Sequence, residues 1–329
     1  MRVRSSLVFA LTVAAPAMTA QTHVVVVSGL GGDAAHRERF HAWAVAMIDA
    51  AQQRFGVPSD NITYLAERTE LDPQRISAKS TKENVERTLV DLSTGLQAGE
   101  GVFILLIGHG SYQGDESRFN LPGPDMTSND FARLLDRFAA QDVVLVNTTS
   151  ASGDFIKELS GPRRTIITAT KSPFERNETV FCQYFVEAFA RDVADVDKDE
   201  RVSVLEAFNY ATHEVRRAYE DDDRLLTEHA QLDDNGDGEG TGDPDPATTD
   251  GAVAHTFVIE GTVAVVAGTS SDSVLAGLKS RQRELQQAIS ELRIRKDTME
   301  PEAYESQLEQ LLLELARVSQ AIREREGGA

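Results

Sequence analysis

Short apolar runs that alternate with segments of helical periodicity constrain the fold of this 329-residue chain more than any other feature. Continuous apolar runs of five or so residues are typical of strands buried on both faces of a sheet. Helical patterns lie between them, at residues 38–55, 81–96 and 127–139. The alternation predicts an α/β fold, a mostly parallel sheet with helices on both faces. The expected strands are Val24 to Val27, Asn61 to Ala66, Gly101 to Ile107, Asp142 to Val146 and Arg164 to Ala169.

The first twenty residues have the pattern of a secretory signal. Arg2 and Arg4 precede an apolar run over residues 7–17, and small residues follow up to Ala20. A buried N-terminal strand is the alternative. The run is too short to cross a bilayer, and no later segment has the roughly 20 apolar residues that a membrane helix needs. We therefore expect cleavage after Ala17 or Ala20, export to the periplasm or the exterior, and no membrane span.

The chain is strongly acidic, with 33 Lys and Arg against 53 Asp and Glu and a net charge of -20. Cleavage of the signal would remove two arginines and no acids, leaving 31 basic residues against 53 acidic ones, a net charge of -22. Such a charge repels phosphate backbones, so nucleic acid is not an expected partner. Such an excess of carboxylates suits cation binding or solubility. The single cysteine, Cys182, excludes an intrachain disulfide.

Composition divides the rest of the chain. The α/β domain is expected to occupy residues 21–265, with a loop-rich acidic insertion at 220–250 and a further strand at 252–260. Beyond it, apolar residues at three-four spacing over residues 272–326, divided by Pro301, predict a helical hairpin or coiled coil. Packing within one chain and self-association are both open for this segment.

Chemically active residues follow two of the predicted strands. The third strand ends in Gly108-His109-Gly110, and the fourth is followed by a segment rich in hydroxyl groups, Asn147 to Gly153. The carboxyl ends of parallel strands meet at one edge of a sheet, where such folds bind their ligands. An imidazole and a hydroxyl at neighbouring strand ends offer a base and a nucleophile.

The order of these motifs resembles that of the legumain-like and caspase-like cysteine peptidases, which share the caspase-haemoglobinase fold. The resemblance extends from about Val24 to Tyr219 and includes Val25 to Gly29, Phe55 to Ile62 and Thr81 to Val85. It implies that His109 is the acid/base of a peptidase, and it makes a polypeptide substrate or a protein partner the expected binding partner. In the family the nucleophile is a cysteine two residues before a Ser-Gly pair. Aligning that pair on Ser152-Gly153 places Ser150 at the cysteine position.

The serine at this position leaves two hypotheses. In the first, the chain is an exported endopeptidase that uses His109 and Ser150, with the backbone near Gly110 and Ser150 stabilising the oxyanion. In the second, it is an inactive pseudo-peptidase that serves as a calcium-stabilised binding or scaffold module through its coiled-coil tail. A hydroxyl needs a well-aligned base, whereas a thiol is partly ionised at neutral pH and strongly nucleophilic. The substitution therefore favours the second hypothesis, and the retained His109 favours the first.

Two acidic segments have the spacing of calcium loops. In the first, acids occupy positions 1, 3, 5 and 12 of an EF-hand loop, and Glu200 stands where glycine is usual. The alternative is that Ser203 and Glu206 form a capping box for the next helix. The expected Ca²⁺ site of this segment comprises Asp195, Asp197, Asp199, Arg201 and Glu206.

The second acidic segment repeats the first half of such a loop. Asp233, Asn235 and Asp237 occupy positions 1, 3 and 5, and the turn glycine is present as Gly238. Pro244 occupies position 12, where an EF-hand has its bidentate carboxylate. By itself this segment is a half-site for Ca²⁺.

Overall fold

A seven-stranded sheet forms the centre of the molecule, as seen in a computed structural model that describes residues 21–191, 193–199, 201–261, eight positions between 277 and 292, and 300–326. The strand order is β10-β9-β8-β4-β1-β2-β3. Every pairing in it is parallel except that of β10 with β9. The strands are β1 (Thr22–Ser28), β2 (Ile62–Ala66), β3 (Ala78–Lys79), β4 (Gly101–Ile107), β8 (Asp142–Asn147), β9 (Arg164–Thr168) and β10 (Gln231–Asp233).

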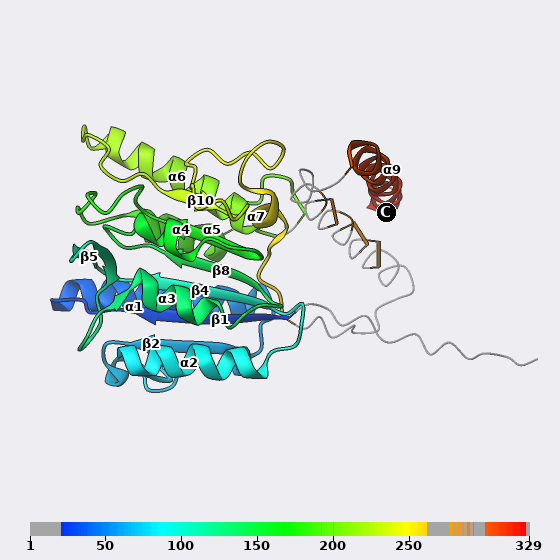
Figure 1. Cartoon of the computed structure of the whole chain (residues 1–329). Coiled ribbons are helices and arrows are strands. Elements are labelled where there is room, and N and C mark those ends of the chain that lie inside the picture. The colour runs from blue at the N-terminus through cyan, green and yellow to red at the C-terminus, as the bar shows by residue number, and fades with distance from the viewer. Residues whose placement is uncertain are drawn as a thin grey trace, which may run out of the picture.

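Helices cover both faces of this sheet, so the predicted fold class is confirmed (Figure 1). One face packs against α1 (Ala34–Gln53), α5 (Phe181–Ala190) and α6 (Val204–Asp221). The other packs against α2 (Lys82–Gly95), α3 (Ser128–Leu135) and α4 (Asp154–Leu159). Alternate residues of each strand point to opposite faces, so Leu105 joins the first core and Leu106 the second.

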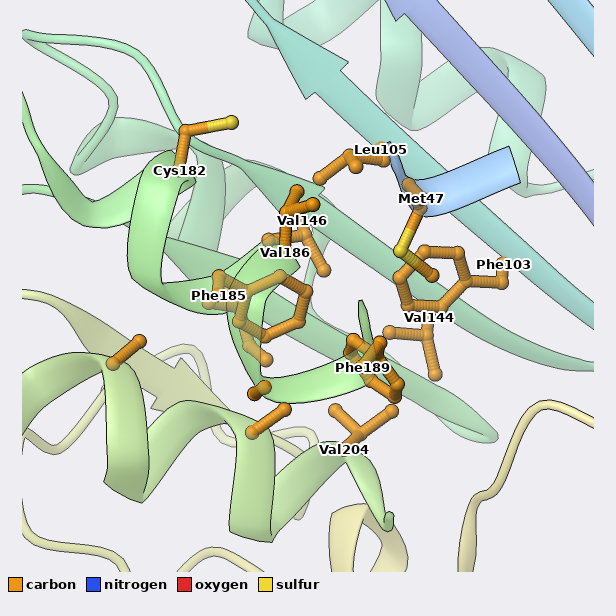
Figure 2. Close-up of a cluster of buried hydrophobic side chains, with 14 of the residues drawn as sticks. Met47, Phe103, Leu105, Val144, Val146, Cys182, Phe185, Val186, Phe189 and Val204 are labelled. Atoms are coloured by element: carbon orange, nitrogen blue, oxygen red, sulfur yellow. The ribbon is translucent and has the colours of Figure 1, made fainter. Parts of the chain in front are cut away.

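The first core is rich in aromatic side chains. Phe103 of β4 stacks on Phe185 of α5 and meets Phe189 edge to face. Figure 2 shows these rings with Met47 of α1 between helix and sheet, and Cys182 at the border of the same cluster. Large aromatic side chains bury 150–250 Å² each, so this packing holds α5 against the central strands.

A small second sheet, β5-β6-β7, follows directly after the end of β4. Its strands are β5 (Gly110–Gln113), β6 (Glu116–Phe119) and β7 (Met126–Thr127). The sequence analysis did not anticipate this hairpin, because its short strands mix polar and apolar residues without a clear period. It leads the chain away from His109 and into α3, whose capping box joins Thr127 and Asp130.

The predicted strand at 252–260 is wrong. Residues Ala252–Thr256 form helix α7, and Val258 makes an isolated bridge with Ser203. The carboxylate of Asp234 accepts the N–H groups of Gly251, Val253 and Ala254 at 2.8 Å each, and so caps this helix from outside its own sequence. The acidic insertion is mainly loop as expected, but β10 runs through it as an edge strand.

The C-terminal segment contains α9 (Pro301–Glu326), which begins at Pro301 and covers the second of the two runs expected to be helical. Arg281 pairs with Glu314 at 2.7 Å, and Gln282 donates to Ser319, so these two residues before Pro301 contact α9. The rest of the first hairpin arm and the predicted signal at residues 1–20 lie outside the described residues. Among those described, no helix combines the length and the hydropathy needed to cross a membrane.

Candidate functional site

The carboxyl ends of β4 and β8 lie side by side in the middle of the sheet. Leu106 of β4 is in register with Asn147 of β8, and the next residue, Thr148, donates both its N–H and its hydroxyl to the Leu106 carbonyl. The two segments that carry His109 and Ser150 therefore start from adjacent points. The structure thus brings together the two strand ends that the sequence singled out.

Ser150 sits at a sharp turn after β8. The Asn147 carboxamide oxygen accepts the N–H and the hydroxyl of Thr149, at 3.1 and 2.8 Å, and so holds the residue before the serine. Ala151 has a φ of 53°, in the left-handed region that is uncommon for alanine. Such conformations persist where the surrounding structure imposes them, often at functional sites. The turn leaves Ser150 only 7% exposed.

Gly110 lies directly against this turn. A Cβ atom at that position would be 2.0 Å from the Ser150 carbonyl oxygen and 2.4 Å from the Thr149 hydroxyl, so no side chain fits. The Ser150 Oγ donates to the Gly110 carbonyl at 3.2 Å. Serine and glycine thus hold the two strand ends together, and the hydroxyl proton points at a carbonyl.

His109 and Ser150 line the same small cavity. Its volume is about 10 Å³, room for about one water molecule. Its wall is formed from both strand ends, from α1 and from the start of α5, by Phe40, Trp43, Gly108, His109, Thr148, Ser150, Glu178, Thr179 and Cys182. Thr179 closes the inner side by donating to the Thr148 carbonyl at 2.6 Å.

The environment of His109 favours the neutral imidazole. Burial lowers the pKa of His109, and the neighbouring His36 lowers it further. A hydrogen bond to the Gly31 backbone acts in the opposite sense, as expected when an imidazole N–H donates to a carbonyl oxygen. Gly31 belongs to the turn after β1, where a Cβ would be 2.9 Å from the backbone nitrogen of Arg37. One ring nitrogen is thereby oriented, which leaves the other as a candidate base.

His36, which the sequence analysis missed, packs against His109. The ring centroids are 4.8 Å apart with an angle of 61° between the planes. His36 lies 2.8 Å from Asp33 and 3.3 Å from Glu178, and the side-chain hydrogen bond with Asp33 is the main reason that the pKa of His36 is raised. Arg39 pairs with the same Glu178 carboxylate. Helix α1 thus places positive charge beside His109.

Cys182 borders the cavity but is unsuited to act as a nucleophile. Burial raises the pKa of its thiol to about 12, so the reactive thiolate is not formed near neutral pH. Cys182 lies in the first turn of α5, and the free backbone N–H groups at the N-terminus of this helix bind a carboxylate from a distant part of the sequence. Glu228 accepts the N–H groups of Val180 and Phe181 at 2.9 and 2.8 Å, and burial raises the pKa of this carboxyl to about 7.

The loop between β9 and α5 supports the serine turn. The carbonyl of Glu175 accepts the N–H of Ala151 at 2.7 Å. The Glu175 carboxylate in turn contacts the imidazole of His229 at 2.5 Å and accepts the N–H of Lys171. His229 lies two residues before β10, so the edge of the sheet is connected to the serine turn through Glu175.

The first predicted calcium loop brings its aspartates together. Among the described residues, Asp195, Asp197 and Asp199 are one group of acids that offer oxygen atoms within 4.8 Å of one another. Burial and the neighbouring acids Asp199 and Glu206 raise the pKa of Asp197. Oxygen atoms so arranged match the ligands that Ca²⁺ takes.

The other two residues predicted for this loop have structural partners. Glu206 forms the capping box with Ser203 that was the alternative interpretation, and its second oxygen accepts the N–H of Val196 at 2.9 Å. The side chain of Arg201 pairs with Glu260. The capping box and the aspartate cluster therefore coexist, since they use different residues of the loop.

The chain matches no protein-family model and no curated protein sequence. Among solved structures it is similar to protein GSU0716 from Geobacter sulfurreducens, with a TM-score of 0.43 and 12% sequence identity. The similarity covers 70% of this chain and 97% of that one.

Proposed function

We propose that this chain is an exported hydrolase of the peptidase class, related to the legumain-like and caspase-like peptidases, with His109 as acid/base and Ser150 as nucleophile. The observation that carries the proposal is that these two residues follow adjacent parallel strands and line one cavity. A polypeptide is the proposed substrate. The resemblance in the sequence supports the peptidase class, and the placement of the two side chains supports their pairing.

The proposed reaction is acyl transfer to the serine. Neutral His109 takes the proton of the Ser150 hydroxyl, directly or through one water, as Oγ attacks the carbonyl carbon of the substrate. The proton then passes from His109 to the leaving amine, and water hydrolyses the acyl-enzyme by the same route in reverse. Backbone N–H groups near Gly110 and at Ser150 are the proposed donors to the oxyanion. Hydrogen bonding of His109 to Gly31 would orient the ring as the third member of a triad does.

A specific contact also supports the alternative of an inactive pseudo-peptidase. Ser150 Oγ donates to the Gly110 carbonyl, and the side chain is almost fully buried. A hydroxyl held in this way must rotate before it can approach a base. In this alternative the same fold serves as a binding module, with residues 272–326 docking a partner or a second copy.

Peptide-library turnover by the chain from Gln21 separates the two. In the active case Ser150→Ala and His109→Ala each abolish cleavage, whereas Ser111→Ala, a hydroxyl outside the cavity, retains it. If the wild type cleaves no peptide but Ser150→Cys does, the cleft is intact and lacks a competent nucleophile. If neither protein cleaves any peptide, the proposed activity is wrong.

We also propose that the 195–206 loop binds Ca²⁺, on the basis of the three aspartates whose oxygens lie close together. Asp195, Asp197 and Asp199 would supply side-chain oxygens, and Arg201 a backbone carbonyl at position 7. Running the turnover assay with 1 mM Ca²⁺ or with EDTA tests whether the ion matters to the strand-end chemistry. Calcium titration of Asp197→Asn tests the loop itself.

A further inference from the structure

A second cavity, much larger than the one at the strand ends, lies beside α6. Its volume is about 280 Å³, and its wall is formed by the start of α5, the middle of α6, residues 226–231 and residues 241–243. It shares no lining residue with the strand-end cavity. A cavity of roughly 150 Å³ accommodates benzene, so this one has room for a molecule with one aromatic ring and a short side chain.

Much of the wall is apolar. Phe181, Val215 and Ala230 are buried members of the first core, and Leu226 packs against the same core. Sites for small molecules are typically lined by apolar side chains, with a few polar groups that orient the ligand. The occupant that fits this wall has an apolar body.

Glu228 supplies a buried carboxyl group to the same wall, at 3% exposure. Its two oxygens accept the N–H groups of Val180 and Phe181, which use two of the roughly four acceptor positions of a carboxylate. Within the part of the chain that the structure describes, no basic side chain forms an ion pair with it, since Arg224 pairs with Asp222 and His229 with Glu175. Buried charges are normally paired, so this carboxyl favours a cationic group in the cavity.

The other charged groups of the wall offset each other. Arg216 and Asp243 have opposite charges, and both are exposed, so they lie at the open side of the cavity. The chain as a whole has a net charge of -20, which attracts cations to its surface. Glu228 therefore sets the charge of the inner part of the cavity.

A hydroxyl group of α6 also lines the cavity. Thr212 Oγ1 is buried and has no hydrogen-bond partner among the described residues. Buried polar groups in proteins normally have a partner, and a hydroxyl can both donate and accept. Thr212 thus offers a second acceptor to a ligand that carries N–H groups.

We propose that this cavity binds a small amphipathic amine, with its ammonium group at Glu228 and its apolar body against Phe181, Val215 and Leu226. The ammonium would donate to the Glu228 carboxylate, and Thr212 Oγ1 would accept from the same molecule. The three hydrogens of an ammonium group suit a wall with several acceptors. The inference does not depend on the chemistry proposed for Ser150.

The position of the cavity connects it to the strand-end site. Glu228 binds the first N–H groups of α5, whose first turn includes Cys182 of the strand-end cavity. His229, which also lines the larger cavity, contacts the carboxylate of Glu175, and the carbonyl of Glu175 accepts the N–H of Ala151. A bound amine would thus stabilise both of the contacts that join the edge of the sheet to the serine turn.

Titration calorimetry of the chain from Gln21 at pH 8 tests the proposal with three molecules of similar shape, 2-phenylethylamine, 2-phenylethanol and 3-phenylpropionate. At this pH the Glu228 carboxyl is ionised, since its pKa is about 7, and the amine is protonated, as a lysine side chain is. We expect the amine to bind about tenfold more tightly than the alcohol, because its hydrogen bond to Glu228 joins opposite charges. The carboxylate should show no measurable binding.

Three variants locate the bound amine. Glu228→Gln should lower the affinity for 2-phenylethylamine about tenfold and leave the affinity for 2-phenylethanol unchanged. Thr212→Val keeps the shape of the side chain and should weaken binding of the amine several-fold. Glu220→Gln, an exposed acid of α6 outside the cavity, is the matched control and should bind as the wild type does.

Three results would overturn the inference. The first is a wild type that binds none of the three molecules. The second is equal affinity for the amine and the alcohol, or tighter binding of 3-phenylpropionate, which would assign the cavity to anions through Arg216. The third is an affinity for the amine that is unchanged in both Glu228→Gln and Thr212→Val, because the amine would then bind elsewhere.

Discussion

Two regions of the molecule, a strand-end site and an acidic edge, differ in the kind of polar group that they bury and in how that group is hydrogen-bonded. In the strand-end site, which comprises His109, Thr148, Ser150 and Thr179, hydroxyls are buried as donors to backbone carbonyls of neighbouring segments. In the acidic edge, which comprises the loops 195–206 and 233–250, carboxylates gather with backbone N–H groups as their donors. The first region carries almost no net charge at its centre, and the second concentrates negative charge.

The difference follows from the chemistry of the buried groups. Neutral hydroxyls and a neutral imidazole can be buried at little cost once they are hydrogen-bonded, so the strand-end region is held by the fold alone. Clustered carboxylates repel one another and lose hydration, so the proposed calcium ion in the 195–206 loop would stabilise the acidic edge. Glu228 and His229 lie between the two regions, where Glu228 accepts the N–H of Val180 at the start of α5 and His229 contacts the Glu175 carboxylate.

The largest expected effect comes from filling the space between the two strand ends. Gly110→Ala would place a methyl group 2.0 Å from the Ser150 carbonyl, so we expect a loss of roughly 3 kcal/mol or more in the free energy of unfolding and a complete loss of any turnover. Urea unfolding measures this change in the free energy of unfolding. Gly95→Ala, at the end of α2 with no atom within 4 Å, should leave stability unchanged or slightly higher. Equal stability of the two variants would show that the strand ends are not packed as described.

Glu228, at the boundary of the two regions, should make stability depend on pH. Burial raises its pKa from 4.5 in the unfolded chain to about 7, so the folded state favours the protonated form. Its contribution is then full below pH 4.5 and is lost as the pH rises through about 7, by up to about 3 kcal/mol. Urea unfolding at pH 5 and at pH 7.5 should show a smaller change for Glu228→Gln than for the wild type. Exposed Glu220→Gln serves as control, and identical pH dependence in all three proteins would contradict the prediction.

Removal of divalent cations should destabilise the acidic edge without altering the cavity. A single site at ten times its Kd contributes about 1.4 kcal/mol to the free energy of unfolding. We expect thermal unfolding to move to lower temperature in EDTA, and the shift to shrink in Asp197→Asn. A transition temperature that is the same with millimolar Ca²⁺ and with EDTA would contradict calcium binding by the 195–206 loop.

The smallest effect is expected at the histidine pair. A positive charge on His36 disfavours protonation of His109, as does Arg39, whereas Glu178 favours it. His36→Gln should therefore raise the pKa of His109, and any turnover should fall a few-fold at pH 5.5 relative to pH 8. NMR titration of the His109 imidazole measures the shift even in an inactive protein. His213→Gln, on an exposed part of α6, is the matched control. A pKa of His109 that is unchanged in His36→Gln would contradict electrostatic coupling between the two histidines.

Much of the sheet was predictable because its signal is local. The continuous apolar runs of β1, β4, β8 and β9 and the periodic segments of α1, α2 and α3 identify themselves within a dozen residues. The β5-β6-β7 hairpin was not predicted, since its polar strands are shaped by packing on the sheet edge and on α3. Local sequence predicts a strand at α7 because the residue that caps this helix, Asp234, lies almost 20 residues before it in the chain.

The sequence by itself determined that His109 and Ser150 follow buried strands, and hence that both belong to the carboxyl edge of the sheet. It also placed acids at alternate positions in two loops. Only the tertiary structure decided that β4 and β8 are neighbours, that His36 packs on His109, that Glu228 closes α5, and that Asp250 joins the Asp233 turn. The physical reason is that periodicity and turn chemistry act between near neighbours. Hydrogen bonds and charges act through space between segments whose proximity depends on how the helices cross over the sheet.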